Sequence, residues 1–91
     1  MVCSQGGSQV IVFTSVRQFE DRDGIRSQRL PDQSSFAKAL MTCRDDAKEW
    51  HRGDLQLVRD PMCSTRTERT YKVIVNGKVE ESEWYVIKEV L

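Results

Sequence analysis

The sequence of 91 residues lacks the features that mark several large classes of protein. Its three cysteines, Cys3, Cys43 and Cys63, are too few and odd in number for a disulfide framework, which fits a reducing compartment. No apolar run approaches the roughly 20 residues that a membrane span needs. Residues 1–8 show neither a secretory signal nor a myristoylation pattern, and we expect a mobile tail there. We therefore expect a soluble, cytoplasmic protein in which residues 9–91 form one domain.

The sequence also lacks an excess of charge of either sign. Lys and Arg together number 14, as do Asp and Glu, so the formal net charge is 0. A domain that neutralises phosphates is usually clearly basic, so this balance disfavours nucleic-acid binding, although it leaves room for a local basic stripe. The dispersed charges and 38% hydrophobic content indicate a globular domain. A chain this short buries roughly 60–65% of its unfolded surface, enough for one core without a large interior cavity.

The motifs of common catalytic and cofactor sites are missing as well. No Gly-x-Ser-x-Gly or His-Glu-x-x-His occurs, and Gly6-Gly7 precedes a strand instead of linking a strand to a helix. The only histidine, His51, lies eight residues after Cys43, about 12 Å along a helix and too far for a catalytic pair. Cys63 could approach His51 only through the fold. The cysteine and histidine spacings do not match a zinc site. We expect no enzyme activity, no cofactor and no metal ion.

The strongest local signal is the dipeptide Asn76-Gly77. Both residue types tolerate a positive φ, so the pair favours a type I′ turn between two antiparallel strands. A two-residue loop pairs Val73 with Glu80, which places charge opposite an apolar arm. The helix should therefore cover the first arm alone, or a bulge should shift the register before Trp84.

Other segments also predict strands. Residues 9–17 are apolar on both faces in their first half, which is typical of a buried central strand. Residues 25–30 alternate weakly and are polar, which favours a sheet edge. Residues 55–58 predict a short strand. Residues 82–91 fit a strand or a short helix, and their Trp-Tyr-Val-Ile run favours the strand.

Between these strands the spacing becomes helical. Apolar residues recur at steps of four, three, four and three, which predicts one apolar seam on a helix from about residue 34 to 51: Phe36, Leu40, Cys43, Ala47 and Trp50. Asp32 or Ser34 is the expected N-cap, and Gly53 a C-terminal stop. The order ββαβββ predicts an α+β fold with one helix on one face of a mostly antiparallel sheet. This is the element order of β-grasp-like and similar two-layer sandwiches.

The charged surface of this helix is its most unusual feature. Its cations follow one i, i+4 ridge and its carboxylates the adjoining surface: Arg44, Lys48 and Arg52, and then Asp45, Asp46 and Glu49. A solvated face with an Asp45–Lys48 pair is the favoured interpretation, since exposed charges usually contribute little. The functional interpretation is a two-signed stripe that docks a partner and sets its register.

The second hairpin offers another surface. Its basic and aromatic residues would suit a single nucleic-acid strand held by stacking: Arg66, Arg69, Lys72, Tyr71 and Tyr85. Nearby glutamates would cancel much of that positive field. A cross-strand pair of Lys72 with Glu81 is therefore the favoured interpretation.

We therefore expect a small non-enzymatic domain that binds another protein as an inhibitor, an adaptor or a subunit, including one encoded by a virus or phage. Open sheet edges would allow strand addition or homo-oligomers. Trp50 is expected in the core, whereas Trp84 and Tyr85 lie on opposite faces of a strand, so that one of them is exposed. The expected partner-binding residues are Arg44, Asp45, Lys48, Glu49, Arg52, Trp84 and Tyr85. The alternative is a nucleic-acid-binding module that uses the helix ridge or the second hairpin.

Overall fold

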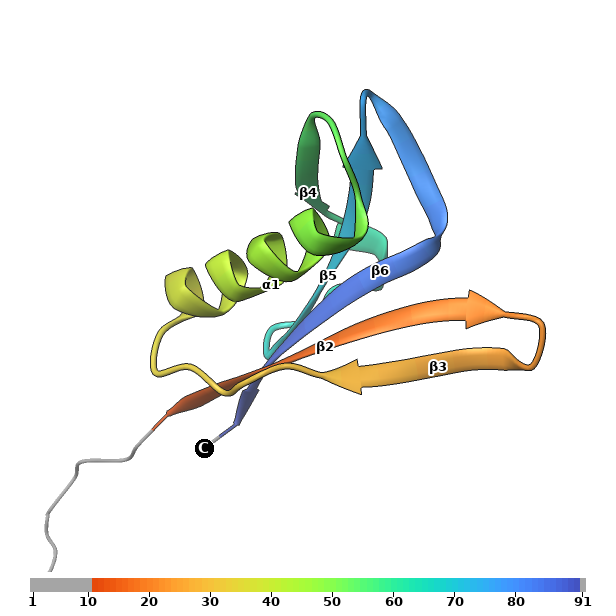
Figure 1. The fold of residues 1–91 in the computed structure, drawn as a ribbon. Helices are drawn as coiled ribbons and strands as arrows, with labels where there is room; N and C mark the ends of the chain where they lie inside the picture. Colours follow the sequence, from red (N-terminus) through yellow and green to blue (C-terminus); the bar gives the residue numbers. More distant parts are fainter. Residues whose placement is uncertain (1–10, 91) are drawn as a thin grey trace, which may run out of the picture.

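A computed structural model describes residues 11–90, in which one helix packs on one face of a five-stranded sheet (Figure 1). The elements follow one another as β2 (Val12–Asp21), β3 (Gly24–Arg29), α1 (Phe36–Trp50), β4 (Leu55–Arg59), the short 3₁₀ turn η1 (Pro61–Cys63), β5 (Glu68–Val75) and β6 (Lys78–Val90). The predicted ββαβββ order and two-layer arrangement are confirmed. The expected tail over residues 1–8, and the expected strand start at residue 9, lie outside the described residues.

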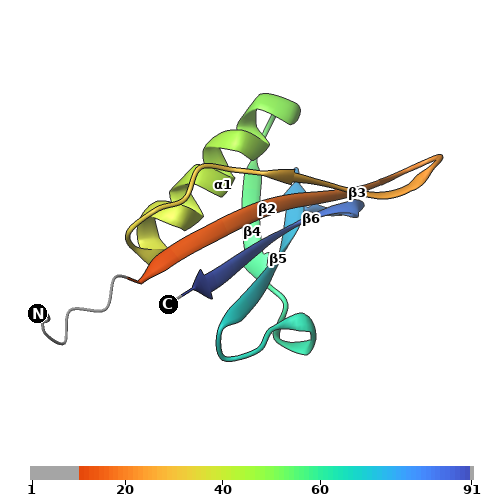
Figure 2. The ribbon, with the colours of Figure 1, turned by 90° about the horizontal axis from the view of Figure 1, so that it is seen from below.

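The sheet has the strand order β3-β2-β6-β5-β4, and all neighbours are antiparallel. After the β2–β3 hairpin the chain passes through α1 to β4, at the opposite edge. It then folds back through β5 to β6, which lies beside β2 at the centre (Figure 2). Residues 25–29 therefore lie on an edge, as predicted, and residues 82–90 form a strand, as their propensity favoured.

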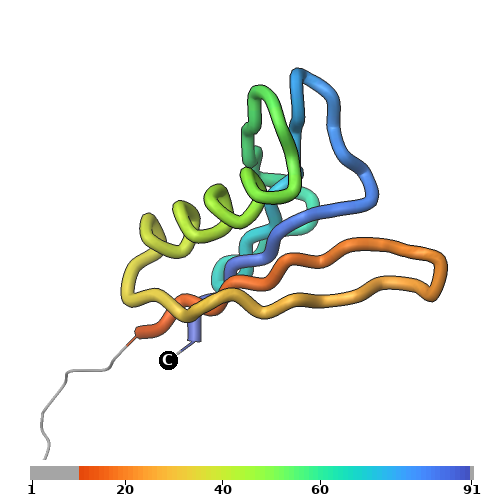
Figure 3. The backbone as a smooth tube through the Cα atoms, in the orientation of Figure 1, coloured from red at the N-terminus to blue at the C-terminus, as the bar shows by residue number. Residues whose placement is uncertain are grey.

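The hairpin around Asn76-Gly77 has the predicted turn, and of the two alternatives for its second arm the structure has the bulge. Both turn residues have positive φ, 52° and 80°. Val73 pairs with Glu80, but Lys72 pairs with Trp84, so residues 81–83 have no counterpart in β5. Figure 3 shows the sharp bend that β6 makes along its length. The predicted Lys72–Glu81 pair is wrong, because the bulge places Trp84 opposite Lys72.

The N-cap of the helix lies one residue after Ser34 and three after Asp32, the two predicted caps. Ser35, not Asp32 or Ser34, is the N-cap, and its Oγ accepts a hydrogen bond of 3.2 Å from the backbone N–H of Lys38. The helix ends at Trp50, where the backbone N–H of His51 donates to the carbonyl of Ala47 at 3.0 Å.

The core lies between α1 and the inner face of the sheet. Small helix residues and large sheet residues meet there: Ala39, Cys43 and Ala47 with Tyr71, Val73, Tyr85 and Ile87. Small side chains let the helix approach the sheet closely, so that the tyrosine rings fill the interlayer space. The expectation of Trp50 in the core is wrong, because its side chain is 55% exposed. The buried residues of α1, Ala39, Cys43 and Ala47, recur every four residues. The buried face therefore rotates around the helix and no longer includes Trp50 in the last turn.

Candidate functional site: a concave sheet face and a free edge

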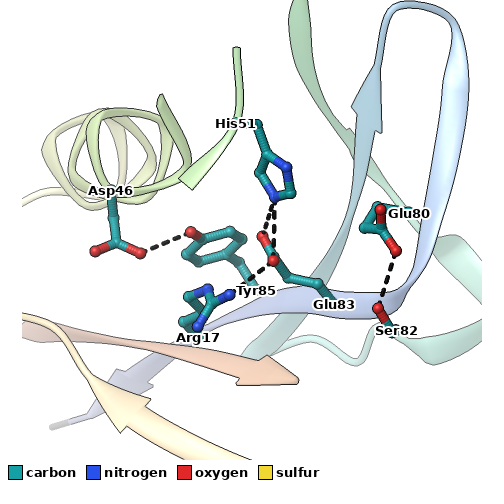
Figure 4. A network of polar contacts seen from close by, with 7 residues as sticks. All are labelled: Arg17, Asp46, His51, Glu80, Ser82, Glu83 and Tyr85. Carbon is teal, nitrogen blue, oxygen red and sulfur yellow. Dashed lines mark hydrogen bonds and ion pairs between the residues drawn. The ribbon is translucent and has the colours of Figure 1, made fainter. Parts of the chain in front are cut away.

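A buried polar network joins β2, β6 and the end of α1 (Figure 4). The guanidinium Nη2 of Arg17 donates to Glu83 Oε1 at 2.8 Å. His51 Nε2 lies 2.9 Å from the second oxygen of the same carboxylate. Glu83 is 5% exposed and Arg17 7%, so a charge pair has been taken out of water here. The carboxylate is fully occupied by this chain's own groups, which makes the network a structural element.

Aromatic rings enclose the cation of this network. The guanidinium carbon of Arg17 lies 4.4 Å from the centroid of Phe19 and 4.4 Å from that of Trp50. Trp50 therefore covers the ion pair from the outside instead of filling the core. Stacked aromatic faces attract a guanidinium, and this offsets part of its desolvation. Arg17 Nε is buried without a hydrogen-bond partner among the described residues.

Two further polar groups lie beside the network, both held in their protonated forms. The Tyr85 hydroxyl donates to Asp46 Oδ2 at 2.7 Å. Burial, followed by this carboxylate, raises the pKa of Tyr85 far above its ordinary value. Burial also raises the pKa of the Cys43 thiol to about 11. A thiol with so high a pKa is a poor nucleophile at neutral pH, so Cys43 is a core residue.

The opposite face of the sheet is concave and carries a cavity of about 480 Å³. It is lined by residues of β2, β5 and β6 and by the segment around η1: Gln18, Asp60, Cys63, Glu68, Thr70, Lys72, Val79, Glu80, Glu81, Glu83, Trp84 and Val86. The bulge explains how β6 supplies this lining. Since three extra residues are an odd number, the side-chain alternation inverts across them, and Val79 and Trp84 reach the same face.

The half-buried Trp84 is the largest side chain of this cavity. Its indole Nε1–H donates to Gln18 Oε1 at 2.7 Å, which fixes the ring against β2. The apolar side chains of Val79 and Val86 also line the cavity. A rigid aromatic ring in a concave surface is the arrangement that dominates binding energy at protein interfaces.

Carboxylates surround this apolar floor. Five of the lining residues are acidic, whereas Lys72 is the only cation among them. Lys72 Nζ lies 3.9 Å from Asp60, and Glu83 is engaged by Arg17 and His51. Three carboxylates then have no cation within ion-pair distance among residues 11–90: Glu68, Glu80 and Glu81. The cavity therefore presents a negative surface around a tryptophan.

A second surface follows the free edge of β4. A groove of about 290 Å³ lies between this edge and α1, lined by Leu40, Arg44, Leu55, Gln56, Leu57 and Val58. Arg44 and Lys48 are exposed, and within the described part of the chain neither forms an ion pair. The predicted Asp45–Lys48 pair is therefore absent. Arg52 lies beyond the end of α1, so the predicted helix ridge has two members instead of three.

The remaining predicted site residues are scattered. Asp45 and Glu49 are exposed on α1, whereas Tyr85 is 0% exposed and lies in the core. Tyr71 is 6% exposed, so neither tyrosine of the second hairpin offers a stacking platform for a base. Arg69 lies over the ring of Phe36, 4.3 Å from its centroid. Of the aromatic residues named from the sequence, Trp84 is the one that lines either of these two surfaces of the described chain.

Sequence reasoning missed the Arg17–Glu83 pair, although a signal was present. Arg17 follows Phe13 and Ser15 at alternate positions of β2, and Glu83 precedes Tyr85 and Ile87 at alternate positions of β6. Two opposite charges that each continue a buried alternation predict a buried pair. The direct pairing of Phe19 with Glu83 shows how the two strands bring these residues together.

No other cluster in the described residues has the chemistry of a catalytic or metal site. Cys63 is exposed, and a hydrogen bond with Asp60 raises the pKa of its thiol. His51 contacts Glu83 and not a cysteine. Within residues 11–90 no three His, Cys, Asp or Glu side chains gather closely enough to hold a metal ion. Nor does that part of the chain contain a helix long and apolar enough to cross a membrane.

Comparison with known proteins gave no relative. No protein-family model, no curated protein and no solved structure matches this chain. The geometry of its own residues is therefore the ground for a functional argument.

Proposed function

We propose that this protein is a small non-enzymatic interaction domain that binds a basic, partly apolar segment of another protein in the cavity around Trp84. The observation that carries this proposal is the combination of a fixed indole ring with an acidic rim in a cavity of about 480 Å³. Concave sites with an apolar floor and a few convergent polar groups are where proteins bind ligands. An adaptor or an inhibitor would use such a surface.

The charge of the cavity selects the partner. Glu68, Glu80 and Glu81 leave the rim negative, so lysine or arginine side chains would be drawn to it. The aliphatic stems of those side chains would pack on Trp84 and Val79, and the cations would reach the carboxylates. A nucleic acid would be repelled by the same rim. A basic polypeptide segment is therefore the ligand class that fits both the ring and the charges.

Within residues 11–90, the buried groups that could carry chemistry are already engaged by the fold, which supports an interaction role. The buried carboxylate, Glu83, is satisfied by Arg17 and His51, and the buried thiol, Cys43, holds its proton. Both oxygens of this carboxylate are therefore engaged, and the thiol is not in the thiolate form that a cysteine nucleophile needs.

Trp84 itself can report binding. In a Trp50→Phe background Trp84 is the only tryptophan, so the fluorescence of the protein reports the environment of the cavity. We expect a short synthetic peptide of alternating lysine and valine to shift its emission, and peptides of alternating glutamate and valine or serine and valine not to do so. The double variant Glu80→Gln/Glu81→Gln should lower the affinity for the lysine peptide by roughly two- to thirtyfold, since each exposed ion pair contributes about 0.2–1 kcal/mol.

The matched control is Glu49→Gln, because Glu49 is an exposed carboxylate on α1, in the other layer of the fold. It should leave the affinity unchanged. Equal shifts of the Trp84 emission with all three peptides, or equal effects of the Glu80→Gln/Glu81→Gln and Glu49→Gln variants on the affinity for the lysine peptide, would refute the assignment of the cavity.

A further inference from the structure

The free edge of β4 and the groove beside it form a second surface of opposite charge. We propose that this surface, the β4 groove (Leu40, Arg44 and residues 55–58), binds an extended acidic segment of a partner protein by strand addition. The proposal uses none of the residues of the Trp84 cavity.

The backbone of β4 is available for pairing. β4 hydrogen-bonds to β5 on one side, and among residues 11–90 no strand pairs with its other side. An edge strand presents unpaired N–H and C=O groups, to which an extended peptide can add as a further strand. The other edge, β3, differs because all six of its residues are exposed and its arginines pair with aspartates of the same hairpin or the segment after it.

The groove offers apolar contacts to alternate residues of an added strand. Leu55 and Leu57 pair with Val75 and Val73, so they lie on the helix-facing side of the sheet. Both leucines and Leu40 of α1 are only partly buried. Leu40, Leu55 and Leu57 form a leucine row, and every second side chain of an added strand would contact it. Strand addition therefore gains side-chain burial on the inner face in addition to backbone hydrogen bonds.

Positive charge borders the same groove. Arg44 lines it, and Lys48 follows one helical turn later, at i+4. Arg59 ends β4 and is exposed. Among residues 11–90 none of the three has a carboxylate within ion-pair distance. Glutamate or aspartate in the added strand would supply the missing counter-charges.

The same cations disfavour the two competing occupants. A second copy that paired β4 with β4 about a two-fold axis would bring the Arg44 and Lys48 sides of two helices together, and like charges would repel. A nucleic acid would meet these few cations but leave the leucine row and the strand backbone without matching partners. An acidic amphipathic polypeptide satisfies all three features.

The test uses the full chain and a synthetic peptide of alternating glutamate and valine, with two comparison peptides. One comparison peptide replaces glutamate with lysine, and the other keeps glutamate but carries N-methyl groups that block strand pairing. Isothermal titration should detect binding of the glutamate peptide and not of its N-methylated form. The lysine peptide is expected to bind in the Trp84 cavity, so it should bind without protecting β4. Hydrogen exchange should slow at the backbone amides of residues 55–59 with the glutamate peptide only.

Charge reversal on the helix separates this surface from others. Arg44→Glu should lower the affinity for the glutamate peptide by roughly tenfold, because it replaces an attraction with a repulsion. Lys38→Glu is the matched control, since Lys38 is an exposed cation on the opposite flank of the same helix. The Glu80→Gln/Glu81→Gln variant should bind the glutamate peptide with unchanged affinity. The β4 groove and the Trp84 cavity are thereby tested independently of each other.

Several results would overturn the proposal. Equal binding of the N-methylated peptide would exclude strand addition. Displacement of the peptide by an oligonucleotide that Arg44→Glu no longer binds would assign the cations to nucleic acid. A stable dimer by light scattering that masks the β4 amides in the free protein would assign the edge to a second copy.

Discussion

The carboxylate of Glu83 lies 2.8 Å from the guanidinium of Arg17, although 66 positions separate the two residues. One residue comes from the first described strand and the other from the bulged part of the last. His51, at the end of α1, contacts the same carboxylate. A single buried group thus connects both layers of the fold at the point where β6 bends.

Removal of one partner of this ion pair should strongly lower the stability of the fold. We expect Glu83→Ala to lower the free energy of unfolding by about 3–5 kcal/mol, because it leaves Arg17 charged and unpaired in the interior. Urea denaturation followed by circular dichroism measures this. Glu81→Ala, at an exposed neighbour in the bulge, should change stability by no more than about 0.5 kcal/mol. The double variant Arg17→Met/Glu83→Leu should lose less than Glu83→Ala alone, and a larger loss would contradict this account.

Cys43 should make stability fall at alkaline pH. Burial raises the pKa of its thiol from 9.0 to about 11, so the folded state holds the proton more tightly than the unfolded state. This contribution is fully present below pH 9 and is lost as the pH rises towards 11, by roughly 2–3 kcal/mol. Denaturation midpoints between pH 8 and 11 measure the loss.

The matched variant for that measurement is Cys43→Ala. It should be less stable at pH 8, because it leaves a small cavity in the core, but its stability should fall less steeply between pH 9 and 11. The decline above about pH 10 should persist, because the pKa of Tyr85 is also raised. Parallel curves for the two proteins would show that Cys43 does not titrate in this range.

Gly53 should tolerate substitution less well than Gly24. Both have positive φ, 102° and 116°, so alanine at either position is strained. A Cβ at Gly53 would also collide with the side chain of Asn76, whereas a Cβ at Gly24 would meet open space. We expect Gly53→Ala to cost about 1 kcal/mol more than Gly24→Ala in the free energy of unfolding. Equal losses would indicate that the Asn76 side chain moves aside.

Trp50→Ala should be a mild substitution for so large a residue. The ring covers Arg17 from solvent, so we expect a loss of about 0.5–2 kcal/mol in the free energy of unfolding. A tryptophan in the core would cost about 3–5 kcal/mol. Ile87→Ala, at a position that is 1% exposed, provides the core reference at about 2–5 kcal/mol. A loss for Trp50→Ala that matches the reference would contradict its covering role.

Much of the fold could be predicted because its signals are local. Asn76-Gly77 needs only its own backbone preferences, and the helix seam needs only the residues of one helix. Trp50 could not be placed, since the spacing that puts it on the apolar seam does not say how far the buried face of α1 rotates along the helix. The Trp84 cavity escaped prediction for a similar reason. It depends on residues from β2, β5 and β6, which a bulge of unknown length brings to one face.

The bulge in β6 also interrupts the hydrogen-bonded ladder at the centre of the sheet. Glu81 and Ser82 pair with neither β2 nor β5, whereas the residues of β6 from Trp84 to Lys88 pair with both. A central strand normally exchanges its amide hydrogens most slowly, yet here the ladder is interrupted in mid-strand. The helix α1 contacts both β4 and β2, so the two parts of the sheet stay joined through the core while the ladder between them is broken. The backbone amides of Glu81 and Ser82 should therefore exchange with solvent faster than those of Trp84 to Lys88, although all belong to one central strand.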